Sequence, residues 1–146
     1  YKNLSLRVLA NGVYGNDIAN GNLLQLATPE GISWSNITTA AYNNAWRPER
    51  TSNSYPRIGY TTNGQIAMPD WIIEDGSFLR ISNINLSYHF DRINIYLSAQ
   101  NLFTFTGYSG YNPEVTSFLY DGLRNGVDWN GQPSARKFTI GLNFNL

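Results

Sequence analysis

The last eleven residues of the chain alternate strictly between apolar and polar side chains. In the stretch R-K-F-T-I-G-L-N-F-N-L (136–146), one parity is apolar throughout: Phe138, Ile140, Leu142, Phe144 and Leu146. Because side chains in a strand point to alternate faces, this stretch predicts a strand with one apolar and one polar face. About ten residues is also the length that a tilted strand needs to cross a bilayer, so the stretch indicates a strand of a membrane-spanning barrel.

The composition favours a barrel wall over an ordinary soluble domain. Charged residues make up 14% of the 146 residues, against about 25% in an average domain, and aromatic residues also reach 14%. The formal net charge is zero, which excludes the electrostatic footprint of a nucleic-acid-binding protein. The absence of cysteine excludes a disulfide scaffold and thiolate metal sites. No apolar run is long enough for a transmembrane helix.

Three earlier stretches show the same two-residue period and predict strands over 2–14, 77–90 and 93–105. With the strand over 136–146, four strands are predicted. Two positions break the pattern, because Arg80 shares the parity of Ile84, and Asn101 shares the parity of Leu97. A β-bulge or a position at the lipid headgroups explains either break, and the sequence alone leaves both explanations open.

The connections between these strands differ greatly in length. Asp91 and Arg92 form a tight turn, whereas residues 15–76 and 106–135 form long connections that hold all six prolines and all four tryptophans. A short helix is predicted within the first connection, over 38–46. Outer-membrane barrels have short periplasmic turns and long extracellular loops. If the strand over 136–146 ends in the periplasm, both long connections are therefore extracellular.

Several stretches resemble the SusC/RagA family of TonB-dependent outer-membrane transporters of Bacteroidetes. They are D-G-S-F-L-R-I-S-N-I-N-L-S-Y (75–88), A-Q-N-L-F-T-F-T-G-Y-S-G-Y-N-P-E-V (99–115) and G-V-D-W-N-G-Q-P-S-A-R-K-F-T-I-G-L-N-F-N-L (126–146). Y-G-N-D-I-A-N-G-N (14–22) and N-A-W-R-P-E-R-T (44–51) also fit the family. The resemblance implies a barrel of about twenty-two strands with an N-terminal plug. It also implies import of glycans or peptides, driven by TonB, beneath a SusD-like surface lipoprotein that acts as a lid.

The expected fold class is all-β, with the C-terminal four antiparallel strands of a large transmembrane β-barrel and two long extracellular loops. The segment is expected to close the barrel wall in the cell outer membrane. Its partners are the remaining barrel strands, the lipid bilayer, the SusD-like lipoprotein and TonB, the last through upstream regions absent here. Because an open sheet edge in lipid leaves costly unpaired backbone groups, the chain is expected to be one piece of a longer polypeptide. No signal peptide precedes the first strand pattern, so a mature or partial chain is expected.

Two alternatives come from other classes of protein. The first is a structural barrel subunit of a larger outer-membrane complex, which a missing plug and TonB box would favour. The second is a soluble carbohydrate-binding β-domain, which exposed apolar stripes disfavour because they invite aggregation in water.

The sequence predicts no enzyme, no catalytic residue, no metal site and no cofactor. His89 is the sole histidine, and the adjacent carboxylates Glu74 and Asp75 point apart on an extended chain. Asp121, Asp128 and Asn130 offer oxygen ligands to calcium, but they lack EF-hand spacing.

Aromatic side chains in the long connections are the better candidates for a binding site, because flat apolar faces with polar edges suit sugars, peptides and protein partners. Packing between loops is the competing explanation for each of them. The candidates for contact with ligand or lid are Trp46, Arg47, Trp71, Tyr108, Tyr111, Tyr120 and Trp129. Residues assigned instead to an aromatic girdle at the membrane surface are Tyr14, Phe78, Tyr88, Phe90 and Phe105.

Overall fold

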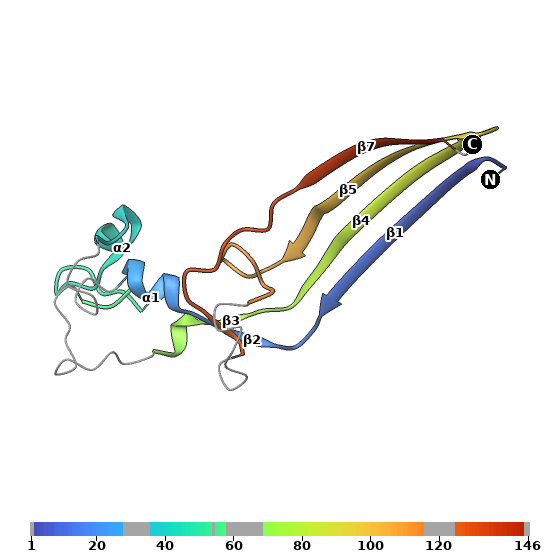
Figure 1. The fold of residues 1–146 in the computed structure, drawn as a ribbon. Coiled ribbons are helices and arrows are strands. Elements are labelled where there is room, and N and C mark those ends of the chain that lie inside the picture. The colour runs from blue at the N-terminus through green and yellow to red at the C-terminus, as the bar shows by residue number, and fades with distance from the viewer. Residues whose placement is uncertain (1, 28–35, 54, 58–68, 116–124, 145–146) are drawn as a thin grey trace. The chain divides into compact units, whose positions relative to one another are not determined.

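The structure is a computed structural model that describes residues 2–27, 36–53, 55–57, 69–115 and 125–144 (Figure 1). The chain divides into two compact units. The sheet unit consists of Tyr1–Asn16, Gly76–Pro113 and Gln132–Leu146, and the loop unit consists of Asp17–Asp75 and Glu114–Gly131.

The sheet unit is a four-stranded antiparallel sheet whose strands follow one another in the order β1-β4-β5-β7 (Figure 1). The strands are β1 (Leu4–Val13), β4 (Phe78–Phe90), β5 (Ile93–Thr106) and β7 (Lys137–Phe144). All four strands predicted from the two-residue period are present. Residues 145–146, included in the predicted last strand, lie outside the described residues.

Two β-bulges explain the breaks in the alternating pattern. The register between β1 and β4 shifts at Leu9/Ala10, where Ser82 is an extra residue on β4. The register between β4 and β5 shifts between Ile81 and Asn83, and Asn101, near this shift on β5, has a positive φ of 52°. Of the two explanations that the sequence left open, the bulge is therefore correct at both positions.

The bulges keep one face of the sheet apolar along its whole length. Residues paired across an antiparallel sheet share a face. The register thus aligns Leu6, Leu86, Leu97 and Ile140 in one row across all four strands. Further apolar rows on the same face contain Leu4, Tyr88, Ile95 and Leu142, and then Val8, Ile84, Ala99 and Phe138. This face is largely exposed in the described part of the chain, since Leu6 is 65% exposed and Ile140 is 77% exposed.

The opposite face is mainly polar. One of its rows contains Arg7, Asn85, Ser98 and Thr139. Tyr96 lies across Gly141 on this face, since a Cβ atom added to the glycine would meet the tyrosine ring.

One residue assigned to the aromatic girdle proves to lie elsewhere. Phe78 belongs to the polar face, because its neighbour Leu79 lies in the row of Phe105. It is only 8% exposed, and the Arg80 guanidinium lies 5.5 Å from its ring centroid. The expectation that Phe78 meets lipid is therefore wrong, whereas Tyr14, Tyr88, Phe90 and Phe105 are exposed.

The loop unit contains short elements that the sequence pattern did not predict. Its sheet has the order β3-β2-β6, formed by Ile73–Asp75, Asp17–Asn20 and Val127–Asp128, and β2 pairs with β6 in parallel. Helix α1 (Gly21–Ala27) follows β2 directly, and the 3-10 helix η1 (Asp70–Ile72) precedes β3. Ile18 and Ile72 are each 1% exposed and form the centre of a small core with Leu24.

Helix α2 (Thr39–Asn44) confirms the short helix predicted over 38–46. It begins at the N-cap Thr38, whose Oγ1 accepts a hydrogen bond from the Ala41 N–H at 3.1 Å. Among the described residues, no helix has the length and apolar character needed to cross a membrane.

Candidate functional site

The candidate site residues are divided between the two units. Trp46, Arg47, Trp71 and Trp129 belong to the loop unit, and Tyr108 and Tyr111 belong to the sheet unit. The remaining candidate, Tyr120, lies outside the described residues.

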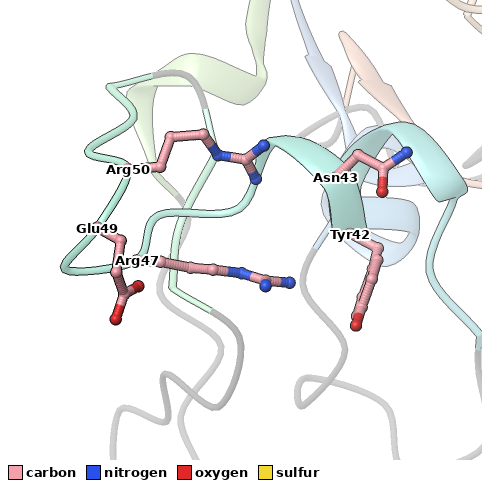
Figure 2. Close-up of a pocket in the computed structure, with 5 residues that line it drawn as sticks. All are labelled: Tyr42, Asn43, Arg47, Glu49 and Arg50. Carbon is pink, nitrogen blue, oxygen red and sulfur yellow. The ribbon is translucent and has the colours of Figure 1, made fainter.

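Arg47 lines a hollow of about 310 Å³ between helix α2 and the turn that follows it (Figure 2). The lining residues are all exposed to solvent: Tyr42, Asn43, Arg47, Glu49 and Arg50. This hollow brings the predicted site residue Arg47 together with two other charged side chains, Glu49 and Arg50. We call it the arginine hollow.

The turn that carries the two arginines is fixed by its backbone. The Arg47 N–H donates to the Arg50 carbonyl at 2.9 Å, and the Arg50 N–H donates to the Arg47 carbonyl at 3.0 Å. Pro48 occupies the second position of this four-residue turn, where its fixed φ is favourable. The two guanidinium groups therefore leave a rigid turn rather than a free loop.

Each arginine side chain is also oriented by a neighbour. The Arg47 guanidinium lies 5.1 Å from the centroid of the Tyr42 ring, within the range of a cation–π contact. Arg50 Nη2 lies 3.5 Å from the Ala45 carbonyl, just beyond the C-terminal end of α2. Figure 2 shows both guanidinium groups extending toward α2, while the Glu49 carboxylate points away from them.

The three predicted tryptophans of the loop unit are half-buried and serve packing at least in part. The backbone N–H of Trp46 donates to the Pro56 carbonyl at 3.3 Å, so this contact fixes the main chain at Trp46. The Trp129 ring lies against Gly21, where an added Cβ atom would come within 2.2 Å of ring atom Cε3. Trp71 lies in η1.

The carboxylates considered from sequence have structural partners. Glu74 Oε1 accepts from Asn20 Nδ2 at 2.9 Å, and Asn20 Oδ1 in turn accepts from the Leu23 N–H and caps α1. Asp128 is 1% exposed, and its Oδ1 accepts from the Gly131 N–H at 3.0 Å. Within the described part of the chain, no group of three or more histidine, cysteine, aspartate or glutamate residues is placed to hold a metal ion. Asp121 lies outside the described residues.

In the sheet unit, buried Arg80 holds the segment that follows β5. Its Nε donates to Thr104 Oγ1 at 2.9 Å, and its Nη2 donates to Asn112 Oδ1 at 2.6 Å. Arg80 is 4% exposed and Tyr108 is 5% exposed, whereas Tyr111 is 74% exposed. The arginine thus fixes a segment that buries one predicted aromatic residue and presents the other to solvent.

Sequence reasoning missed four residues of the arginine hollow: Tyr42, Asn43, Glu49 and Arg50. A usable signal was present, because R-P-E-R (47–50) places proline at the second position of a turn between two arginines. The contribution of Tyr42 depends on the helix that precedes the turn and has no such local signal.

Comparison with known proteins assigns the family. No family model matches the chain. TonB-dependent receptor P3 of Formosa agariphila is 30% identical over 98% of this chain, which spans 15% of that protein. TonB-dependent receptor SusC of Bacteroides thetaiotaomicron is 32% identical over 74% of the chain, corresponding to 11% of SusC. The chain thus spans only a small part of the curated relatives that it matches.

Solved structures share the fold over the same small part. The RagAB peptide importer in its open-open state has a TM-score of 0.78 and 22% identity, and the match covers 99% of this chain and 16% of that chain. The closed-closed state gives a TM-score of 0.75 with 24% identity over the same shares. Over nearly its whole length, the chain is homologous to part of a SusC/RagA-type TonB-dependent receptor, a family of transporters rather than enzymes.

Proposed function

We propose that the chain is the C-terminal wall segment of an outer-membrane barrel that imports nutrients with energy from TonB. In this proposal the apolar face of the sheet meets lipid, and the polar face meets the lumen. The loop unit and the segment after β5 then belong to the extracellular loops, and the turn at Asp91 and Arg92 is periplasmic.

The continuous exposed apolar face carries this proposal. Strand β4 has 13 residues. At a rise of about 3.3 Å per residue and a tilt of about 40°, such a strand spans roughly 33 Å, more than the apolar band of about 25 Å in outer-membrane barrels. A soluble β-domain would instead leave this face in water, where a patch of this extent favours aggregation.

The two edge strands also support the proposal that the sheet is part of a barrel wall. Within the described residues, β1 and β7 each pair along one side only. Unpaired backbone groups in lipid cost several kcal/mol each, so in the proposed barrel both edges pair with neighbouring wall strands.

The substrate and the partner are proposed from the relatives. The similar structures are of a peptide importer, RagAB, and one similar protein is SusC. We infer uptake of peptides or glycans together with a SusD-like surface lipoprotein. Of the predicted site residues that the structure describes, Arg47 and Tyr111 are exposed, and they are assigned to contact with ligand or lid.

The half-buried tryptophans Trp46, Trp71 and Trp129 are assigned to the same role through the part of each side chain that is exposed. Tyr108 is assigned to support of the segment that presents Tyr111, because Tyr108 itself is buried. Tyr120 is retained as a candidate from the sequence alone.

Cysteine labelling tests the membrane assignment. The sequence given has no cysteine, so Leu97→Cys and Ser98→Cys in the complete polypeptide introduce adjacent thiols on opposite faces. We expect a small water-soluble maleimide entering the lumen to label Ser98→Cys but not Leu97→Cys, because maleimides react with the thiolate and a thiol facing lipid keeps its proton. Leu97→Cys should be labelled once the protein is unfolded in urea. Equal labelling of both by the water-soluble reagent would contradict the barrel wall.

A further inference from the structure

We infer that the arginine hollow is a binding site for a carboxylate group. The inference rests on the proposal that the loop unit faces the outside and meets ligand or partner. It goes beyond that proposal by naming the chemical group recognised and the two side chains that recognise it.

The first argument is the supply of hydrogen-bond donors. Arg47 and Arg50 together present two planar guanidinium forks, and a fork binds a carboxylate through two parallel hydrogen bonds. Among the described residues, the recorded partners of these side chains are the Tyr42 ring and the Ala45 carbonyl, neither of which is an acid. Both side chains are exposed, so they can offer further N–H donors to a ligand.

The second argument is preorganisation. The reciprocal backbone hydrogen bonds of the turn fix the separation of the two Cα atoms, and the Tyr42 ring restrains the Arg47 side chain. A ligand that binds ordered side chains loses less affinity to their immobilisation, which ordinarily costs about 0.5–1.5 kcal/mol per side chain.

The third argument concerns selectivity. Glu49 lines the same hollow and makes it less positive than two arginines alone would. Its carboxylate points away from the guanidinium groups, so it does not occupy the forks (Figure 2). This arrangement favours a ligand with one carboxylate over a dense polyanion. Asn43 adds a hydrogen-bond donor to the hollow, and Tyr42 adds an apolar surface.

A carboxylate can come from a peptide or from an acidic sugar, and the two sources are separable by titration. The probes are a glycine-rich peptide with blocked ends and one central glutamate, and a galacturonate disaccharide. Each is compared with its neutral counterpart, the glutamine peptide or the methyl ester. Calorimetric titration uses the complete receptor in detergent, with inorganic phosphate as a third probe.

We expect at least one carboxylate probe to bind more tightly than its neutral counterpart, and the probe that binds identifies the source. Arg47→Ala should weaken that binding about tenfold or more, as expected for loss of hydrogen bonds to a charged group. Arg47→Lys should recover only part of it, because lysine keeps the charge and loses the fork. Arg57→Gln is the matched control: it removes one exposed positive charge from the same unit, outside the hollow, and should leave binding unchanged.

Three results would overturn the inference: no preference for either carboxylate probe over its neutral counterpart, equal weakening by Arg57→Gln, or binding of phosphate alone. A melting temperature matched to wild type shows that each variant is folded. Labelling at Leu97→Cys and Ser98→Cys in the same receptor separates the two proposals, because a normal labelling pattern with failed carboxylate binding removes only this site.

Discussion

A single arginine placed at Leu97 should destabilise the folded protein far more than the same arginine at Ser98. Leu97 lies in the apolar row that crosses β1, β4, β5 and β7, and the row sits near the middle of the apolar face of β4. Ser98 is the next residue along the strand and lies on the polar face. The two substitutions therefore differ in the face that receives the charge and hardly at all in depth.

The magnitude follows from the depth of the row. An arginine on the lipid face of an outer-membrane barrel costs about 2–4 kcal/mol at the bilayer midplane and about 0–1 kcal/mol near the interfaces. Leu97→Arg should therefore lower the folding equilibrium constant roughly 30- to 700-fold relative to Ser98→Arg. Phe90→Arg, at the turn end of β4, tests the depth dependence and should cost about 1 kcal/mol or less.

The assay is refolding of the complete polypeptide from urea into phosphatidylcholine vesicles. Folded and unfolded fractions are separated by their different mobility in unheated electrophoresis, and titration with urea gives the free energy of unfolding for each variant. If Ser98→Arg costs as much as Leu97→Arg, or if Phe90→Arg costs more than Leu97→Arg, the sheet does not have a lipid face centred on this row.

Three further substitutions test the packing that supports the candidate site. Arg80→Met should lower the free energy of unfolding by about 3 kcal/mol and speed amide hydrogen exchange in the loop after β5, because two hydrogen bonds are lost. Arg7→Met, at an exposed position on the same face, is the control and should change neither quantity. Gly21→Ala should lower the free energy of unfolding by about 1–3 kcal/mol and alter tryptophan fluorescence, because the added methyl group meets the Trp129 ring. Gly107→Ala is the control and should change neither, because a Cβ atom added there meets no heavy atom within 4 Å. Thr38→Ala should lower the free energy of unfolding by about 1 kcal/mol and speed amide hydrogen exchange in α2, because the helix loses its N-cap. Thr38→Ser should leave both quantities unchanged, because serine keeps the hydroxyl group that caps the helix.

The long strands were predictable because their signal is local. A two-residue period over eight or more residues is visible in any one strand, and the pairing of β4 with β5 follows from the short turn at Asp91 and Arg92. The bulge at Ser82 was visible only as a parity break at Arg80. Choosing between a bulge and a headgroup position required the register of β1 against β4, which no single strand contains.

The loop unit was not predictable for the opposite reason. Its sheet joins Ala19 to Val127 in parallel, and the backbone N–H of Asn130 donates to Asn22 Oδ1 at 2.8 Å across 108 residues. Segments of two to four residues carry no period of their own, so their pairing is decided by contacts distant in sequence. The arginine hollow is local by contrast, since its lining residues all lie within 42–50. Arg47 was predicted but Tyr42 was not, because their contact depends on the direction in which the turn leaves helix α2.

The bulge on β4 explains how one strand serves two environments. Without the bulge at Ser82, strict alternation from Ile84 would place Arg80 on the apolar face and turn Leu79 and Ile81 to the polar one. With it, Leu79 and Ile81 continue the apolar face. An unpaired arginine on the lipid side would cost up to about 4 kcal/mol. On the polar side the same guanidinium binds Thr104 and Asn112. By accommodating Ser82, the bulge therefore keeps a charge off the apolar face and makes it the contact that holds the segment bearing Tyr108 and Tyr111, and links the wall to its proposed ligand-facing surface.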